Sequence, residues 1–299
     1  MKKIYMSGCG GMLGEAFYNI FKDSFQLSCS DIDVNEPWLQ YLDFRDFTSY
    51  KREVNKFQPN YLFHIGAFTD LEFCEKNIDE TYLTNTISVE NAVYIANELN
   101  IPLLFISTAG IFDGSKEEYD DWDQPNPLCH YARSKYAAER FVLNSANRPL
   151  VLRAGWMMGG GPNKDKKFVS KILKQIKDGK KILHIVDDRL GTPTYTYDFA
   201  KNAKSLIENE VWGLYNLVCQ GTTGRYEVAK KILSILKLED KIQIKRVDSS
   251  FFANEYFAPR PSSERLINKK LQLRGLDMMR DWEVCLDEYL KESYKDYLL

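Results

Sequence analysis

The sequence has little of what marks several simple classes of protein. Its 6 cysteines among 299 residues are widely and irregularly spaced, without a Cys-x-x-Cys pair, which favours reduced thiols over a disulfide framework or a zinc site. The 3 histidines form no metal-ligand pattern, so no metal site is expected. The chain has no apolar run of about 18 residues for a transmembrane helix, and its first segment lacks the long apolar core of a signal peptide. We therefore expect a cytoplasmic protein.

An excess of charge of one sign is also missing. The formal net charge is -2, so nothing in the charge balance indicates nucleic acid or an anionic membrane as a partner. Hydrophobic residues make up 44% and charged residues 27% of the chain, which is typical of a globular protein. At this length we expect one large domain or two closely joined ones.

Short apolar segments alternate with amphipathic ones through the first half of the chain. We expect strands at 4–6, 25–30, 60–66, 101–107 and 149–154, and helices at 12–21, 47–57, 81–99 and 131–145. This alternation indicates a parallel sheet with helices on both faces. The predicted fold class is therefore α/β, a Rossmann-type doubly wound parallel sheet.

The pattern changes after Gly155. A glycine-rich and then charged loop leads to a predicted helix at 168–177, a strand at 213–218, a helix at 225–236, a strand at 242–247 and a mixed tail. We predict a sheet domain at 1–158, to which residues 187–219 return. Residues 159–186 and 220–299 would then form a smaller, interleaved C-terminal lobe that binds the substrate.

A glycine-rich turn follows the first expected strand and opens the first expected helix. Gly8, Gly11 and Gly14 stand three residues apart. Glycines permit positive φ and remove the Cβ atoms that would block a pyrophosphate, and a helix N-terminus offers free N–H groups to phosphate. This context at the start of a βαβ unit predicts dinucleotide binding in the domain 1–158. The turn residues expected at the cofactor are Gly8, Gly10, Gly11, Met12, Leu13 and Gly14.

Asp31 ends the second expected strand, and Asp33 is the competing candidate for the same role. A carboxylate there can accept hydrogen bonds from the adenosine ribose, and it would repel a 2′-phosphate. The first basic residue that follows is Arg45. We therefore expect NAD as the cofactor, with NADP as the alternative, and place Asp31 and Ile32 at the adenosine.

Tyr131 and Lys135 have the spacing Tyr-x-x-x-Lys. Residues four apart lie on one face of a helix, so the ammonium can lie beside the phenol. At about 4 Å its attraction would lower the pKa of the phenol by up to about three units, from about 10 towards neutrality. Such a tyrosine can give a proton to a carbonyl oxygen while a hydride arrives at the carbon.

With these motifs, the chain resembles the extended short-chain dehydrogenases/reductases over nearly its whole length, and among them the dTDP-4-dehydrorhamnose reductase-like branch. Ser107-Thr108-Ala109-Gly110-Ile111-Phe112-Asp113-Gly114 is similar to the family's Ser-Thr-Asp-Tyr-Val-Phe-Asp-Gly. Later segments similar to family signatures are Arg153-Ala154-Gly155-Trp156, Gly191-Thr192-Pro193-Thr194-Tyr195 and Arg260-Pro261.

The resemblance implies roles for individual residues. For the cofactor it adds Asp43 and Phe44 beside the adenine, Gly66, Ala67 and Phe68 along the dinucleotide, Asn85, Tyr131 and Lys135. For catalysis it implies Thr108 as the hydrogen-bond donor to the substrate oxygen, Tyr131 as the general acid, and Lys135 as the residue that tunes Tyr131 and binds the nicotinamide ribose. Trp156 and Arg153 are expected to bind the substrate, and a structural ion pair is an equal alternative for Arg153.

Two departures from the family concern the substrate. Ala109 and Gly110 stand where the reductases carry Asp and Tyr, at positions that face the sugar. The loop at 157–162 also differs from the family's short Val-Tyr-Gly. These differences leave the hydride chemistry intact and put a rhamnose-type sugar in doubt.

The function implied by the resemblance is an NAD(P)-dependent oxidoreductase that reduces the keto group, at C4, of a nucleotide-activated deoxysugar. One alternative is a sugar-nucleotide epimerase of the same superfamily. Another is a non-catalytic dinucleotide-binding regulatory subunit, because the methionine adenosyltransferase beta subunit resembles the same branch. A dehydratase is disfavoured, since Ala109 and Gly110 supply no acidic residue. The expected partner is a nucleotide sugar, and a homodimer is the alternative to a monomer.

Overall fold

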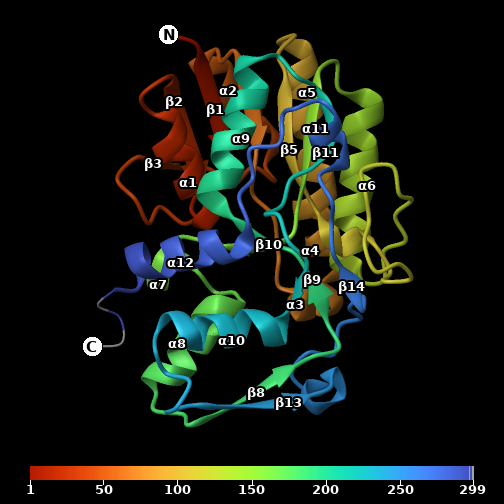
Figure 1. Ribbon diagram of the computed structural model, residues 1–299. Helices are drawn as coiled ribbons and strands as arrows, with labels where there is room; N and C mark the ends of the chain where they lie inside the picture. The colour runs from red at the N-terminus through yellow and green to blue at the C-terminus, as the bar shows by residue number, and fades with distance from the viewer. Residues whose placement is uncertain (296, 298–299) are drawn as a thin grey trace.

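A parallel sheet of 7 strands runs through the larger part of the molecule (Figure 1), in the order β11-β6-β5-β4-β1-β2-β3. The structure is a computed structural model that describes residues 1–295 and 297. The strands are β1 (Lys3–Ser7), β2 (Gln26–Asp31), β3 (Leu39–Tyr41), β4 (Tyr61–His64), β5 (Leu103–Thr108), β6 (Pro149–Ala154) and β11 (Gly213–Asn216). The chain order reverses beside β1, so the doubly wound α/β prediction is confirmed.

Helices cover both faces of this sheet, because alternate strand residues are apolar on each side. On one face Tyr5, Leu62 and Phe105 pack in a core with helices α2 (Phe47–Phe57), α5 (Ser88–Glu98) and α6 (His130–Ser145). On the other face Ile4 and Phe63 pack in a core with α1 (Met12–Phe21) and α9 (Thr196–Glu208). Burial on both sides explains why the central strands β4 and β5 are largely continuous apolar runs in the sequence.

A smaller lobe lies below the sheet in Figure 1. It contains α8 (Phe168–Lys177), α10 (Arg225–Ile235) and the parallel pair β8 (Ile182–Val186) and β13 (Gln243–Val247). Short strands link it to the sheet domain: β7 (Trp156–Met158) pairs with β10 (Pro193–Tyr195), and β9 (Leu190–Gly191) lies between β12 (Thr223–Gly224) and β14 (Ser263–Glu264). The remaining elements are α3 (Leu71–Lys76), α4 (Ile78–Tyr82), η1 (Leu83–Ile87), η2 (Ala109–Ile111), α7 (Gly161–Lys164), η3 (Ser249–Phe252), α11 (Lys269–Leu273) and α12 (Trp282–Ser293).

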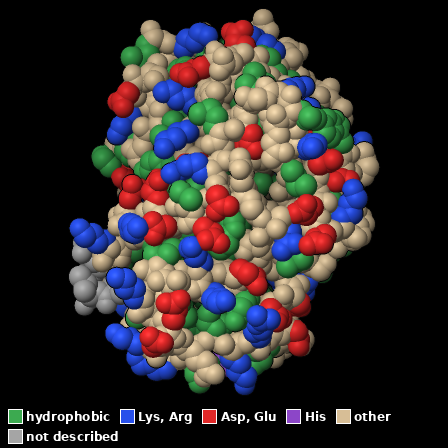
Figure 2. Space-filling model, viewed as in Figure 1, with side chains coloured by type: hydrophobic (Ala, Val, Ile, Leu, Met, Phe, Trp, Pro, Cys, Tyr) green, Lys and Arg blue, Asp and Glu red, His purple; other side chains and the backbone are tan. Residues whose placement is uncertain are grey.

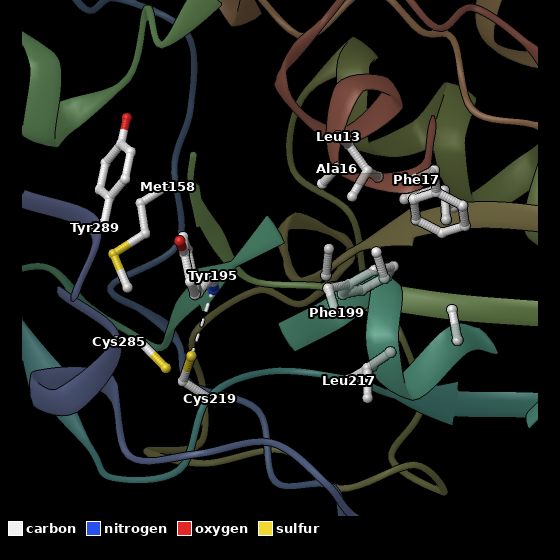
Figure 3. Packing of buried hydrophobic residues seen from close by; sticks show 14 of the residues in the cluster. Leu13, Ala16, Phe17, Met158, Tyr195, Phe199, Leu217, Cys219, Cys285 and Tyr289 are labelled. Atoms are coloured by element: carbon white, nitrogen blue, oxygen red, sulfur yellow. Dashed lines mark hydrogen bonds between the residues drawn. The ribbon is translucent and has the colours of Figure 1, made fainter. Parts of the chain in front are cut away.

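The apolar core is continuous between the sheet domain and the lobe. Figure 3 shows Leu13, Phe17 and Phe199 at one side of this core and Tyr195 and Tyr289 at the other. The Tyr289 hydroxyl also donates to the Gly159 carbonyl at 3.0 Å, which ties α12 to the glycine-rich loop. A shared core of this kind fixes how the two parts face each other and therefore the shape of the cleft between them.

The structure agrees with most of the predicted elements and corrects several. The helices at 12–21, 47–57 and 168–177 have the predicted bounds. The helix predicted at 81–99 is instead α4, a π-helical turn at η1, and α5. The strand predicted at 213–218 ends at Asn216, and α9, α12 and β8 were not predicted.

The division of the chain at residue 158 stays a proposal. Residues 187–219 do supply α9 and β11 to the sheet domain. Part of the segment 220–299 also bonds to it, since the Asn216 side-chain amide donates to the Ile267 carbonyl at 3.1 Å. No helix in the described ranges is long and apolar enough to span a membrane. On the face in Figure 2, basic and acidic side chains are interspersed.

Candidate active site

A cavity of about 1790 Å³ lies at the carboxyl ends of the central strands, between the sheet and the lobe. Its lining begins at the glycine turn after β1 and continues past Asp31 at the end of β2, Gly66 after β4 and Thr108 at the end of β5. The lobe closes the opposite side with α8 and residues around Phe251. In doubly wound sheets, ligands bind at this edge, where the strand order reverses.

The glycine turn has the backbone geometry that a dinucleotide phosphate requires. Gly8 has a φ of +78°, and a Cβ there would lie 2.1 Å from the Gly66 Cα. A Cβ on Gly14 would lie 2.3 Å from the Cys9 carbonyl oxygen, so this glycine allows α1 to pack against the turn. Gly11 differs, because a Cβ on it would meet nothing within 4 Å. It is the N-cap residue of α1, without a side-chain cap among the described residues, so the first amides of the helix face a space that suits a pyrophosphate.

Asp31 lies against this turn. Its carboxylate accepts the Gly10 N–H at 2.7 Å and the Asp33 N–H at 2.9 Å. It therefore braces the turn as well as lining the cavity. Asp33 also lines the cavity, beside the exposed Ile32.

The residues expected at the adenine and along the dinucleotide fall into two groups. Phe44, Gly66, Ala67 and Phe68 line the cavity. Asn85 lies outside its lining, and its side-chain amide bonds to both the N–H and the carbonyl of Phe68, at 2.8 and 3.0 Å. Asn85 thus positions the segment at 66–68.

Asp43 forms an ion pair beside Phe44. Its two carboxylate oxygens accept hydrogen bonds from the Arg45 guanidinium, the shortest at 2.6 Å, and this contact lowers the pKa of Asp43. Arg45 also pairs with Glu80 at 3.1 Å. Both members of the Asp43–Arg45 pair line the cavity, and the sequence analysis did not assign Arg45 to the site.

Thr108 and Tyr131 lie close together in the lining of the cavity. Thr108 is the last residue of β5, its hydroxyl accepts the Gly110 N–H at 3.1 Å, and it interacts with the Tyr131 phenol. Tyr131 lies in the first turn of α6. Burial raises the pKa of Tyr131, and the bond to Thr108 opposes the rise. The predicted shift of this pKa towards neutrality is therefore wrong for this structure, because desolvation of the phenolate dominates.

Lys135 lies one turn further along α6 and is buried. Burial lowers its pKa to about 7, and the carboxylate of Glu139 opposes the decrease. Its ammonium lies 4.1 Å from the centre of the Phe105 ring. Burial also lowers the pKa of His64 to about 3, and the charge of Lys135 adds to this shift. Lys135 is therefore poised near neutral pH to gain or lose a proton.

Arg153 does not reach the cavity. Its guanidinium forms an ion pair with Glu139 at 2.6 Å, and both residues are almost fully buried. The Ser107 hydroxyl donates to the same carboxylate at 2.6 Å. The structure thus contradicts the substrate-binding assignment of Arg153 and favours the ion pair that the sequence left open.

The lobe side of the cavity holds three side chains in contact. The Trp156 indole N–H donates to Glu264 Oε2 at 2.7 Å. The Arg225 guanidinium carbon lies 4.4 Å from the centre of the Trp156 ring. Burial lowers the pKa of Arg225, and the charge of Glu264 opposes the decrease. All three line the cavity. Of them only Trp156 was assigned from the sequence, because Arg225 and Glu264 stand in no motif.

Two further basic residues line this side. Arg260 bonds to both carboxylate oxygens of Glu72, at 2.7 and 2.9 Å. Lys167 donates to the Thr69 hydroxyl at 2.9 Å. The sequence analysis noted Arg260 as part of an Arg-Pro signature, and Lys167 lies at the end of the charged loop that precedes the helix at 168–177. Both contacts join the lobe to the segment after β4.

Residues 1–295 match the family model described as the RmlD substrate binding domain. The chain belongs to this family. The spore coat polysaccharide biosynthesis protein SpsK of Bacillus subtilis is 28% identical over 294 residues, 98% of each chain. The dTDP-4-dehydrorhamnose reductase of Yersinia enterocolitica has a solved structure that is 30% identical with a TM-score of 0.87, over 97% of this chain and 99% of that one.

A second solved structure bears on the cofactor. The dTDP-4-dehydrorhamnose reductase of Bacillus anthracis, in complex with NADP, is 26% identical with a TM-score of 0.89, over 98% of this chain and 100% of that one. These matches confirm the resemblance to the reductase-like branch of the extended short-chain dehydrogenases/reductases. They also confirm an NAD(P)-dependent oxidoreductase with a nicotinamide dinucleotide as its cofactor.

Proposed function

We propose that the protein reduces the C4 keto group of a nucleotide-activated deoxysugar, with Tyr131 as the proton donor. The observation that carries this proposal is the contact between Tyr131 and Thr108 in the same cavity as the glycine turn. A dinucleotide that extends from the turn along the carboxyl ends of the strands would bring its reactive end to these two hydroxyls. The residues proposed to hold it are those of the turn, Asp31 and the segment at 66–68.

The chemistry follows from what each side chain can do. When bound, the reduced nicotinamide supplies a hydride to the carbonyl carbon. The phenol of Tyr131, whose raised pKa keeps it protonated, donates its proton to the carbonyl oxygen. Thr108 donates a hydrogen bond to the same oxygen and stabilises its developing charge. Lys135, with a pKa of about 7, is the nearby group that can return a proton to the tyrosine.

The lobe supports a substrate with a diphosphate. Arg225, Arg260 and Lys167 all line its side of the cavity. Guanidinium and ammonium groups bind phosphate oxygens strongly in a partly buried site. The large volume of the cavity also suits a dinucleotide and a nucleotide sugar together.

NAD is the proposed cofactor, with NADP as the alternative. Asp31 places a negative charge where a 2′-phosphate would bind, and Arg45 is already paired with Asp43 and Glu80. The Bacillus anthracis reductase is in complex with NADP. The proposed preference for NAD therefore rests on the residues of this chain alone, and it requires a direct measurement.

The test is oxidation of NADH with a panel of 4-keto nucleotide sugars. The parent protein should oxidise NADH with at least one of them. Tyr131→Phe should reduce kcat by about 100-fold or more, with NADH affinity unchanged. Tyr136→Phe, which removes a phenol from the same helix without touching the proton donor, is the matched control and should keep the parent rate. Equal rates in Tyr131→Phe and the parent would contradict the assignment. Sugar interconversion without net NADH consumption would replace the reductase with the epimerase.

A further inference from the structure

Glu264 brings a carboxylate to the two residues proposed for catalysis. It ends β14, far along the chain from β5 and α6. A Cβ built on Gly110 would lie 3.2 Å from Glu264 Oε1, 3.5 Å from Thr108 Oγ1 and 3.8 Å from Tyr131 Cε1. The three side chains therefore converge beside residue 110, where the absence of a side chain lets them approach one another, and all three line the cavity.

The carboxylate is held in one orientation. Its Oε2 accepts the Trp156 indole N–H at 2.7 Å. A Cβ on Gly191 would lie 2.1 Å from the Trp156 ring, so the indole packs directly against the backbone there. Arg225 packs on the same indole at 4.4 Å. Trp156 thus has little freedom, and it fixes Glu264 in turn.

The other oxygen of Glu264 faces the cavity. No hydrogen bond reaches Oε1 from residues 1–295 or 297, whereas Oε2 is engaged. Neighbouring positions offer no competing polar group, since Ala109 is buried with an apolar side chain and Gly110 has none. An oriented carboxylate oxygen with free lone pairs is an acceptor for a ligand hydroxyl or amine.

We propose that Glu264 is a specificity residue that accepts a hydrogen bond from a hydroxyl on the sugar carbon next to the reacting carbonyl. The inference rests on the proposed function, in which Thr108 and Tyr131 hold the carbonyl oxygen. Glu264 Oε1 and Thr108 Oγ1 both lie within 3.5 Å of one point, so they address neighbouring substituents of a sugar ring. In a 4-keto-6-deoxysugar the hydroxyl next to C4 is the one on C3.

The local charge favours a neutral hydroxyl over a protonated amine. Glu264 and Arg225 contact the same indole and interact electrostatically, so their charges compensate each other. An ammonium on the sugar would add a second cation beside Arg225. A hydroxyl gains a charge-assisted hydrogen bond without that repulsion.

Binding measurements test this inference without turnover. The probes are dTDP-rhamnose, its 3-deoxy analogue and its 3-amino analogue, titrated by calorimetry into protein saturated with NADH. The parent should bind dTDP-rhamnose about 10- to 100-fold more tightly than the 3-deoxy analogue. In Glu264→Gln, the amide oxygen can still accept from Trp156, and the NH2 group offers the sugar hydroxyl a neutral donor in place of a charged acceptor, so this ratio should fall several-fold. Glu117→Gln, which alters a highly exposed carboxylate paired with Arg265, should keep the parent ratio.

The outcomes separate this inference from the proposed function. An unchanged ratio in Glu264→Gln, tighter binding of the 3-amino analogue, or no binding of dTDP-rhamnose by the parent would overturn the inference. The predicted ratios without NADH oxidation on any 4-keto sugar would support the inference and overturn the reductase. NADH affinity and thermal unfolding should match between Glu264→Gln and the parent. If Glu264→Gln does not fold, Glu264→Ser takes its place with the same expected loss of the ratio.

Discussion

The two ends of the cavity are built in different ways. The end proposed for the dinucleotide (the dinucleotide end) is built mainly from backbone: Gly8, Gly11 and Gly14 come from one short stretch of chain, and their lack of side chains leaves the space. The end proposed for the sugar (the sugar end) consists of side chains from separate elements, among them Trp156 on β7, Arg225 at the start of α10 and Glu264 on β14. One end is a local property of the chain, and the other exists only after folding.

This difference matters for specificity. A backbone turn that binds a pyrophosphate can serve many substrates, because the phosphates are common to all of them. The side chains at the sugar end are independent of the turn, so they can change without loss of the cofactor. Glu264 is proposed to supply a polar contact near the reacting carbon, and Ala109 and Gly110 beside it add none. Substitutions at each end should therefore have separable effects.

The largest expected effect is at Gly8. Gly8→Ala would place a Cβ 2.1 Å from the Gly66 Cα in a left-handed backbone conformation. Overpacking and left-handed strain together should lower the free energy of unfolding by about 2–5 kcal/mol. Urea unfolding monitored by circular dichroism measures this loss. A variant as stable as the parent would show that the turn can relax and is not set by its contact with Gly66.

Gly11→Ala is the matched control in the same turn. Residue 11 has an ordinary φ of -87° and room for a Cβ, so stability should stay within about 0.5 kcal/mol of the parent. The methyl group would intrude where the phosphates are proposed to approach, and NADH affinity should fall by about 10- to 100-fold. Binding equal to the parent would mean that the pyrophosphate lies elsewhere.

The sequence predicted the dinucleotide end much better than the sugar end. The turn, α1 and β1 are contiguous, and their spacing shows in the chain itself. Tyr131 and Lys135 were also recognisable, since one helix carries both. The place of Glu264 in the cavity could not be predicted, because only the fold creates its contact with Trp156. Arg153 was misassigned for the same reason: its partner Glu139 is on α6, and nothing local connects the two.

The predicted pKa of Tyr131 was wrong for a different reason. The spacing of Tyr131 and Lys135 predicts their proximity, and from it we expected attraction to dominate. Burial of both groups is a tertiary property, and it is the largest cause of both pKa shifts in the folded chain. Helix periodicity alone carries no information about how much water the strands and the lobe exclude.

The next prediction concerns Lys135, which lines the cavity between the dinucleotide end and the sugar end. Its pKa is about 7 in the folded protein and about 10.5 in the unfolded chain, so the unfolded state binds more protons between these values. The free energy of unfolding should therefore rise with pH in this window, by about 1 kcal/mol per pH unit from this group. Lys135→Met has no ammonium group and therefore lacks this pH-dependent contribution to the free energy of unfolding. Urea titrations at pH 7.5, 8.5 and 9.5 should show the parent gaining stability relative to the variant, and parallel profiles would contradict the buried, near-neutral lysine.

The smallest expected effect is at Asp31. This side chain is proposed to make the dinucleotide end prefer NADH over NADPH. Asp31→Asn removes the negative charge and keeps one acceptor oxygen, so it retains one of the two hydrogen bonds that the carboxylate accepts from Gly10 and Asp33. A partly exposed charge of this kind contributes about 1 kcal/mol, so NADPH should bind about fivefold better relative to NADH than it does to the parent. Fluorescence titration with both reduced dinucleotides measures this ratio. Added salt should bring the affinities for NADPH and NADH closer together in the parent, because it screens the repulsion between Asp31 and a 2′-phosphate. If the ratio of NADPH to NADH affinity is the same in the parent and the variant, Asp31 only braces the turn. The dinucleotide end would then not discriminate between the two cofactors through this side chain.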